Sequence, residues 1–309
     1  MSAPPAAVPA AGLVSPVRAW LLASRPATLP AAAVPVIVGG AAASYEGAVF
    51  RPFVFITTLA AALLIQVGTN FANDYSDFHR GADHEGRLGP VRVTQSGLIS
   101  HHAVRRGIVV AFGLAALLGA GLAVIGGWPI ILIGVLSLVC GLAYTGGPWP
   151  FGYHGLGDIF VFGFFGPVAV TGTAYLQAGY WSALALALSI PIGLLVTNIL
   201  VINNLRDLPT DRAAGKRTLA VRIGDSGARG QYALLMAMAY LVSGVLAAGS
   251  SSRRWLLLPW LTVPFAVVLV RRVQGGLAGR ELNPMLERTG KLLLIFGLLL
   301  AAGLMLARR

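Results

Sequence analysis

Long runs of residues without a single charge divide the chain into apolar segments joined by short polar ones. The charge-free runs are 26–45, 52–73, 107–157, 159–205, 230–252, 255–270 and 292–307. A helix that crosses a bilayer needs about 20 mostly apolar residues, and two of these runs are long enough for two helices each. We expect the first to break at residues 126–129 (Gly-Gly-Trp-Pro) and the second near Gly179 and Tyr180. The pattern predicts an all-α integral membrane protein with about nine transmembrane helices.

The basic residues lie mainly on one side of this arrangement. With the N-terminus inside, the inside segments carry 18 of the 23 Lys and Arg residues, and the outside segments carry five. Short loops rich in Lys and Arg stay on the cytoplasmic side. We therefore expect a multi-pass protein of the cell membrane, with a cytoplasmic N-terminus, cytoplasmic loops at 73–106 and 203–229, and the C-terminus outside. Residues 1–24 do not read as a signal peptide. They are expected to form a flexible tail before one membrane domain over 25–309.

The composition excludes the main soluble classes of protein. Hydrophobic residues make up 56% of the 309 residues and charged residues only 11%, against about a quarter charged in a soluble domain. The net charge of +12 is typical of cytoplasmic loops that face anionic lipid. We accordingly expect membrane lipid as a neighbour and no nucleic-acid partner. The single cysteine, Cys140, lies in an apolar run and indicates no disulfide framework.

Seven of the eleven acidic residues gather in two of the inside segments. They are Asp74, Asp77, Asp83, Glu85, Asp207, Asp211 and Asp225. The first group directly follows an apolar run. If the helix of that run continues, Asn70, Asp74 and Asp77 fall on one of its faces, with Asn73 beside them. The sequence therefore predicts a polar site at the end of a membrane helix.

The second group has the same helical spacing. Asn203, Asp207 and Asp211 are four residues apart and would share one helix face. Pro209 restricts Leu208 and removes a backbone donor, which leaves open whether the helix continues beyond Asp207.

Carboxylates at this spacing repel one another unless a cation lies between them. Mg²⁺ is a hard ion that typically takes one or two carboxylates together with phosphate oxygens of a substrate. Basic residues that suit the remaining phosphate oxygens follow both groups. They are Arg80, Arg87, Arg92, Lys216, Arg217 and Arg222. Solvated loops with internal salt bridges are the alternative, but two such groups on the same side of the membrane favour a metal-bridged diphosphate.

The position of the site at the membrane favours a lipid diphosphate as the substrate. In a polyprenyl diphosphate, the tail would lie along the apolar helices while the diphosphate reaches the metal. Neutralisation of its charge makes the diphosphate a leaving group, and the allylic cation would then react with an electron-rich acceptor.

These motifs resemble those of the UbiA-type membrane prenyltransferases. The segment Asn-Asp-Tyr-Ser-Asp at 73–77 with Asp83, and Asp-Leu-Pro-Thr-Asp at 207–211, resemble the two aspartate-rich motifs of that family. Four stretches between residues 25 and 224 resemble the branch that acts on 1,4-dihydroxy-2-naphthoate. They are RPATLP, NDYSDFHRGADHEGRLGPVRVTQSGLI, YTGGPWPFGYHGLGDIFVFGFFGPVAVTGTAYLQ and NNLRDLPTDRAAGKRTLAVRIG. The six-residue step from Asp77 to Asp83 also matches this branch, because the hydroxybenzoate branch has a step of four.

The resemblance implies a fold, a reaction and a set of site residues. The fold is nine transmembrane helices around a central cavity that both motifs cap on the cytoplasmic side. The reaction transfers the polyprenyl chain to 1,4-dihydroxy-2-naphthoate with loss of CO₂ and diphosphate, giving demethylmenaquinol in menaquinone biosynthesis. Two Mg²⁺ ions would be held by Asn73, Asp74, Asp77, Asp207 and Asp211. Further substrate-binding candidates are Arg25, Asn70, Asp83, Arg87, Asn203, Lys216, Arg217 and Arg222.

A turn between two expected helices contributes weaker candidates. Tyr144, Tyr153, His154 and Asp158 surround it, and they are candidates to contact the aromatic acceptor or to take its phenolic proton. Alternatively, Gly and Pro shape this turn and Asp158 only caps the next helix. We count Asp158 with the four motif aspartates as a catalytic candidate.

Two other functions remain open from the sequence. A UbiA-type enzyme with another aromatic acceptor, such as 4-hydroxybenzoate, would share the motifs. A cation transporter could also use membrane Asp and Asn residues, but it would be expected to place acids in the middle of its spans, and here they lie at the helix ends.

Overall fold

The computed structural model describes residues 14–80, 88–89, 92–249 and 251–307. These residues are mostly helical and contain no strand, which confirms the all-α prediction. The helices are α1 (Pro16–Ser24), α2 (Leu29–Tyr45), α3 (Pro52–His79), α4 (His101–Gly126), α5 (Trp128–Ala143), α6 (Gly157–Gly163), α7 (Ala169–Ala178), α8 (Ala183–Ala213), α9 (Leu219–Ala248), α10 (Val263–Gln274) and α11 (Asn283–Ala307).

The number of membrane-crossing segments agrees with the sequence pattern. In the described part of the chain, eight helical segments are long and apolar enough to cross a bilayer. They are Pro16–Tyr45, Pro52–His79, His101–Gly126, Gly157–Ala178, Ala183–Ala213, Leu219–Ala248, Arg253–Gln274 and Gly279–Ala307. Helix α5 is apolar but shorter, and with it the count of apolar helical segments is roughly the nine expected. The two expected breaks are also confirmed, since α5 begins directly after Gly127 and α7 ends before Gly179.

Both aspartate-bearing helices extend beyond their apolar runs. Helix α3 continues to His79 and carries the first group of aspartates. Helix α8 continues through Pro209 to Ala213, which answers the question that this proline left open. The charge-free runs therefore underestimate helix length at the polar end of the bundle.

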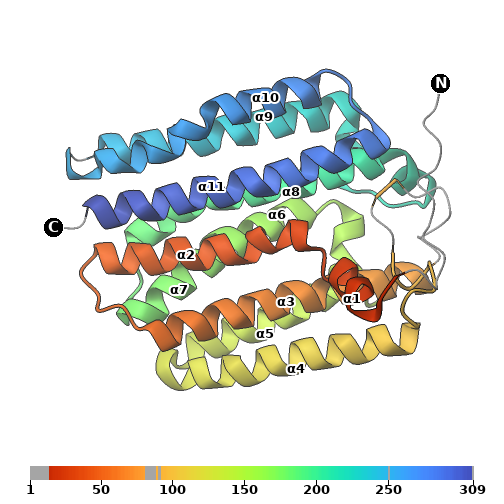
Figure 1. Ribbon diagram of the computed structural model, residues 1–309, viewed down its shortest axis with the longest axis horizontal. Helices are drawn as coiled ribbons and strands as arrows, with labels where there is room; N and C mark the ends of the chain where they lie inside the picture. Colours follow the sequence, from red (N-terminus) through yellow and green to blue (C-terminus); the bar gives the residue numbers. More distant parts are fainter. Residues whose placement is uncertain (1–13, 81–87, 90–91, 250, 308–309) are drawn as a thin grey trace.

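The helices form an elongated bundle with its polar ends on one side. Figure 1 shows the ends of α3 and α8 and the beginnings of α9 and α11 at the same end as α1, while α11 finishes at the opposite end. Helix α8 lies inside the bundle and buries Leu188, Ile192 and Ile202 completely. Helix α4 instead exposes Leu117 and Val124, as expected for side chains that face lipid.

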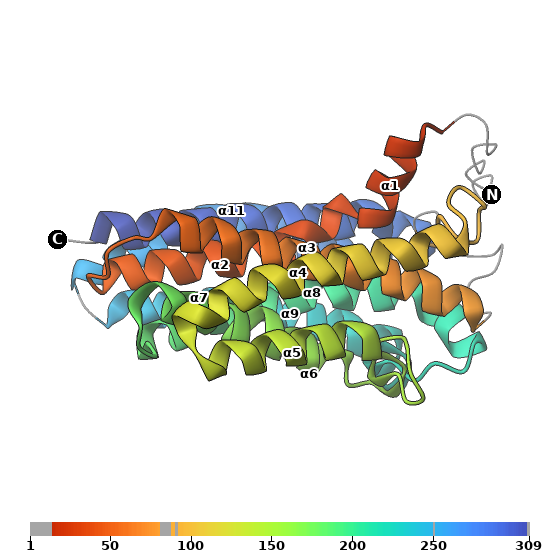
Figure 2. The same cartoon turned by 90° about the horizontal axis from the view of Figure 1, so that it is seen from below.

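The segment 16–24, expected to belong to a flexible tail, forms helix α1. The Ser15 hydroxyl accepts a hydrogen bond from the backbone N–H of Arg18 and caps this helix. Ala19 and Ala23 are buried, and α1 packs on α3 at an angle to the bundle (Figure 2). Residues 1–13 lie outside the described residues.

A π-helical turn interrupts the span between α6 and α7. It covers Phe164–Val168 and contains Pro167, which has no backbone N–H to donate. Such turns reorient the side chains that follow them and are frequent at functional sites. Here the turn places Phe164 and Phe165 against an apolar pocket.

Candidate active site

A small polar cavity lies where α3 and α8 end. Its volume is about 80 Å³. Its lining residues are Arg25, Asn73, Asp77, Arg92, Tyr144, Thr145, Gly152, Tyr153, Asn203, Asn204, Asp207, Thr210, Asp211, Lys216 and Thr218. The two predicted motifs, about 130 residues apart in the sequence, thus meet in one cavity.

The first motif divides between two faces of α3. Asn73 and Asp77 line the cavity, and the Asn73 side-chain oxygen accepts a hydrogen bond of 2.8 Å from the Thr145 hydroxyl. Asp74 instead accepts hydrogen bonds from the backbone N–H groups of Val93 and Thr94, each at 3.2 Å. In the structure Asp74 therefore holds the chain that follows the first motif.

Asn70 lies one turn earlier and contacts the N-terminal region. Its amide donates to the Ser24 carbonyl at 2.9 Å and to the Thr28 hydroxyl at 3.1 Å. Both partners flank Arg25, whose left-handed backbone (φ 50°) is rare outside glycine. Arg25 lines the cavity, so Asn70 supports the segment that presents this guanidinium.

Three donors converge on the Asp77 carboxylate. Arg92 pairs with one oxygen at 2.5 Å, and the Tyr153 hydroxyl donates to the other. The Lys216 ammonium lies 3.5 Å from Asp77 and 3.6 Å from Asp211. Lys216 therefore joins the two motifs electrostatically.

The second motif presents one continuous face of α8 to the cavity. Asn203, Asp207 and Asp211 all line it, as their spacing predicts. Asp207 is bound through both oxygens by the guanidinium of Arg206, at 2.8 and 2.6 Å. Arg206 is buried and does not line the cavity.

Tyr144 and Tyr153 border the cavity from the predicted turn. Burial, and after it the charge of the Asp158 carboxylate, raises the pKa of the Tyr144 phenol well above its usual value. Tyr144 thus stays a neutral hydroxyl donor at physiological pH. The ring of Tyr153 lies under the Lys216 ammonium, 4.4 Å from it.

His154 and Asp158 lie outside the cavity lining. The His154 ring stacks on Trp149 with 4.6 Å between ring centres. Asp158 is buried at the start of α6 and accepts a hydrogen bond of 2.8 Å from the Gln231 amide of α9. Its contacts thus join two helices of the bundle.

The remaining basic candidates have different positions. Arg217 and Arg222 are exposed. The Arg217 backbone N–H donates to the Tyr153 carbonyl, and the Arg222 side chain donates to the His154 carbonyl, each at 2.8 Å. In this structure they hold the turn against α9. Asp83 and Arg87 lie outside the described residues.

Sequence reasoning missed several cavity residues. They are Thr145, Asn204, Thr210 and Thr218, together with Arg206 behind the cavity. Arg92 was noted only as one of the bases that follow the first motif. A stronger signal existed for Arg206, because an arginine directly beside a motif aspartate in a membrane helix needs a partner for its charge.

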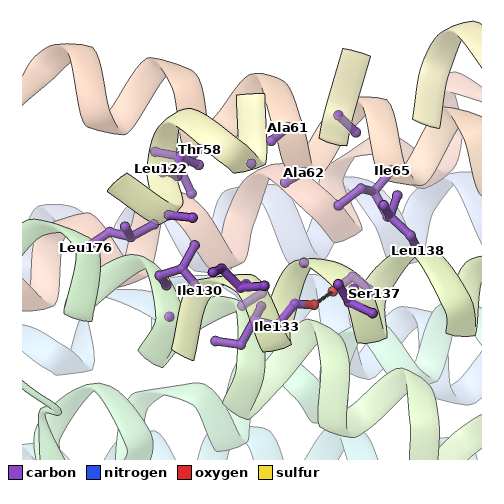
Figure 3. A pocket seen from close by; sticks show the side chains of 18 of the residues that line it. Thr58, Ala61, Ala62, Ile65, Leu122, Ile130, Ile133, Ser137, Leu138 and Leu176 are labelled. Atoms are coloured by element: carbon purple, nitrogen blue, oxygen red, sulfur yellow. Dashed lines mark hydrogen bonds between the residues drawn. The ribbon is translucent and has the colours of Figure 1, made fainter. Parts of the chain in front are cut away.

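Two apolar pockets follow the polar cavity, each sharing a lining residue with the one before it. The nearer one, of about 130 Å³, shares Tyr144 with the polar cavity and is lined by Phe151, Phe160 and Phe164. The farther one, of about 640 Å³, shares Phe164 with it and runs between α3, α4, α5 and α7 (Figure 3). It reaches Val124, which is 88% exposed on the outside of the bundle. The lining of the three cavities thus changes from polar to aromatic and then to aliphatic.

The polar cavity offers the ligands that a hard divalent cation prefers. Carboxylate oxygens of Asp77, Asp207 and Asp211 and amide groups of Asn73 and Asn203 surround it, and oxygen donors of this kind suit Mg²⁺. In the described part of the chain, no three His, Cys, Asp or Glu side chains form a preassembled metal cluster. Instead, Arg92, Lys216 and Arg206 balance the carboxylates.

Comparison with known proteins agrees with this architecture. The model of the UbiA prenyltransferase family matches residues 32–281. The chain belongs to the UbiA prenyltransferase family. It is therefore a multi-pass membrane prenyltransferase, and the resemblance found in its two motifs is confirmed.

Several curated members of the family are similar over nearly their whole length. The 1,4-dihydroxy-2-naphthoate octaprenyltransferase of Mycobacterium tuberculosis is 41% identical over 286 residues, 92% of this chain and 96% of that protein. The enzyme of the same name from Escherichia coli is 38% identical, over 96% of this chain and 97% of its own. Human UbiA prenyltransferase domain-containing protein 1 is 32% identical, over 94% and 87%.

Solved structures support the fold. A UbiA homolog from Archaeoglobus fulgidus, bound to DMAPP and Mg²⁺, superposes with a TM-score of 0.65 over 93% of this chain and 99% of that one. The UbiA homolog from Aeropyrum pernix superposes with a TM-score of 0.64 over 90% and 96%. Sequence identities of 15% and 18% limit both comparisons to the fold.

Proposed function

We propose that this protein transfers a polyprenyl chain from polyprenyl diphosphate to 1,4-dihydroxy-2-naphthoate, with release of CO₂ and diphosphate and formation of demethylmenaquinol for menaquinone biosynthesis. The supporting observation is the order of the cavities, which places carboxylates and cations at one end and an apolar chamber at the other. This order matches a molecule with an anionic head and a long hydrocarbon tail. The naphthoate acceptor follows the names of relatives that are 38% and 41% identical to this chain.

Mg²⁺ ions, two in this proposal, would be held by Asn73, Asp74, Asp77, Asp207 and Asp211. When bound, they would neutralise the diphosphate and make it a better leaving group. In this assignment, the Asp74 carboxylate would bind a metal ion while it also accepts the hydrogen bonds from the backbone N–H groups of Val93 and Thr94.

The basic residues of the cavity would bind the diphosphate oxygens. Arg92 and Lys216 already lie at the cavity wall against Asp77, and Arg25 lines the same space. An arginine fork suits two phosphate oxygens at once, while a lysine provides a point charge. Charge on the departing diphosphate would thus be stabilised by groups that are already in place.

The acceptor would lie between the polar cavity and the aromatic cavity. Phe151 and Phe160 stack with 4.1 Å between ring centres and form one wall, and Tyr144 lines both cavities. In this proposal, the neutral Tyr144 hydroxyl points toward the acceptor. There it can donate a hydrogen bond to an oxygen of the acceptor.

The bond changes at the acceptor explain why the reaction needs no base at the ring carbon that is prenylated. The C–O bond of the prenyl diphosphate breaks and its electron pair leaves with the diphosphate. The ring carbon that bears the carboxylate forms the new C–C bond. The carboxylate then leaves as CO₂, and its bonding electrons restore the aromatic ring. Because CO₂ leaves in place of a proton, no base is required at that carbon, which agrees with the contact between Asp158 and Gln231 outside the cavity.

We also propose an orientation for the protein. The polar cavity would face the cytoplasm of the cell membrane, with the N-terminus on the same side and the C-terminus outside. The distribution of basic residues supports this arrangement.

A direct test is incubation of the purified protein with Mg²⁺, octaprenyl diphosphate and 1,4-dihydroxy-2-naphthoate, followed by mass analysis. The expected product carries the prenyl chain and lacks the carboxylate. Prenylation of 4-hydroxybenzoate instead would keep the reaction class and overturn the acceptor. Absence of any prenylated product with either acceptor would contradict the proposed activity.

A further inference from the structure

Arg206 is a charged side chain in the interior of the bundle. It is 1% exposed and is the largest of the fully buried side chains. Transfer of a guanidinium from water into such a site is unfavourable unless its charge and its N–H groups are satisfied. The partners of Arg206 therefore indicate why it is there.

Those partners include two residues of the cavity wall. Nε and Nη2 of Arg206 bind the two oxygens of Asp207 at 2.8 and 2.6 Å. Nη2 also donates to the Asn203 side-chain oxygen at 2.8 Å. Asn203 and Asp207 both line the polar cavity, whereas Arg206 does not. Arg206 thus fixes two cavity groups from behind.

The guanidinium is itself held by two other segments. Its Nη1 donates to the Asn283 side-chain oxygen at 3.0 Å, and the Asn283 amide donates to the Leu88 carbonyl at 3.1 Å. Asn283 begins α11, and Leu88 lies in the segment that follows the first motif. A methyl group on Gly89 would lie 2.7 Å from Nη2, so the backbone packs directly against the guanidinium.

We propose that Arg206 is a positioning residue that orients the Asp207 carboxylate and the Asn203 amide for a divalent cation in the polar cavity. This inference rests on the proposed function, since it assumes that the cavity binds a metal. A carboxylate has about four lone-pair positions, and a guanidinium fork occupies only part of them. Asp207 and Asn203 themselves line the cavity. Hydrogen-bonded supports of this kind commonly determine how tightly a metal site binds.

The test measures metal binding separately from turnover. Mn²⁺ binding to the purified protein in detergent, without substrate, is followed by electron paramagnetic resonance. Arg206→Gln is expected to weaken Mn²⁺ binding about 10- to 100-fold. Arg206→Lys is expected to restore little of the loss, because an ammonium cannot reproduce the planar fork. Relative to the unaltered protein, Arg206→Gln should turn over much more slowly at low Mg²⁺. This difference should become much smaller at saturating Mg²⁺.

Two further variants separate positioning from a general loss of stability. Gly89→Ala keeps the arginine but displaces its guanidinium, and it is expected to weaken Mn²⁺ binding with the fold retained. Arg229→Gln removes another buried arginine that pairs with an aspartate, Asp225 at 2.6 Å, away from the cavity. This control is expected to leave Mn²⁺ binding unchanged.

The outcomes distinguish this inference from the proposed function. Unchanged or tighter Mn²⁺ binding in folded Arg206→Gln and Gly89→Ala would overturn the positioning role while leaving the prenyl transfer intact. Equal weakening in Arg229→Gln would also overturn it, because the effect would then be general. If the unaltered protein binds Mn²⁺ only after inorganic diphosphate is added, the variants are compared in its presence. If it binds no Mn²⁺ either alone or with inorganic diphosphate, the metal-assisted function itself is contradicted, and the inference falls with it.

Discussion

At the scale of single residues, the aspartates of the two motifs have different tasks. Asp77 and Asp211 line the cavity and share Lys216 between them. We expect Asp77→Asn and Asp211→Asn each to lower kcat at least about 100-fold, the scale typical for loss of one group that stabilises transition-state charge. Product formation by mass analysis measures the effect. Asp225→Asn is a suitable control, because this acid is 58% exposed on α9 and does not line the cavity.

Asp74 should tolerate the same change better than Asp77. Its two oxygens accept backbone hydrogen bonds from Val93 and Thr94, and the amide oxygen of an asparagine can replace one of them. We therefore expect Asp74→Asn to keep about 10-fold more activity than Asp77→Asn. Asp74 is also a proposed metal ligand, so part of its activity should be lost. Equal loss in the two variants would contradict the prediction, because the backbone contacts of Asp74 would then contribute little beside metal binding.

Tyr144 provides a prediction about pH. Because burial raises the pKa of its phenol, Tyr144 keeps its proton through the neutral and moderately alkaline range. The alkaline limit of activity should therefore lie at the same pH in Tyr144→Phe as in the unaltered protein, although kcat falls about 10-fold. Rates from pH 6 to 10 check this. A limit that moves on substitution would mean that Tyr144 itself ionises during the reaction.

At the scale of helices, the sequence predicted the helices themselves better than which of their side chains face the cavity. The four-residue spacing of Asn203, Asp207 and Asp211 was sufficient to predict their common side of α8, where all three line the cavity. On α3, the same reasoning grouped Asn70 with Asp74 and Asp77. The partners that separate them, Ser24 and the backbone at 93 and 94, come from distant segments, so helical periodicity alone could not distinguish the two faces.

The apolar cavity between α3, α4, α5 and α7 allows a prediction about the length of the prenyl donor that the protein accepts. Gly134 of α5 lines this cavity, and a Cβ atom there would meet open space. Gly134→Leu should raise KM for octaprenyl diphosphate about 10-fold by filling space needed for the tail, with little effect on geranyl diphosphate. Steady-state rates with the two donors measure the ratio.

Gly113→Leu is the matched control for this change. Gly113 lies on α4, is exposed, also has open space around a Cβ atom, and does not line the cavity. It should leave both KM values unchanged. A Gly134 variant with an unaltered donor ratio would place the tail elsewhere in the molecule.

At the scale of the whole molecule, the bundle has one polar end, which must lie on one particular side of the membrane. Arg92 and Lys216 line the polar cavity together with residues of both motifs. The helices that carry the motifs, α3 and α8, end on the same side as α1 (Figure 1), and the diphosphate substrate is charged. The charge pattern predicts a cytoplasmic location for this end. Single cysteines introduced into a Cys140→Ser background test it, with a membrane-impermeant maleimide added to intact cells. Val49→Cys, between α2 and α3, should react in intact cells, and His102→Cys at the start of α4 only after lysis. The reverse pattern would place the polar cavity outside, where cytoplasmic prenyl diphosphates would not reach it.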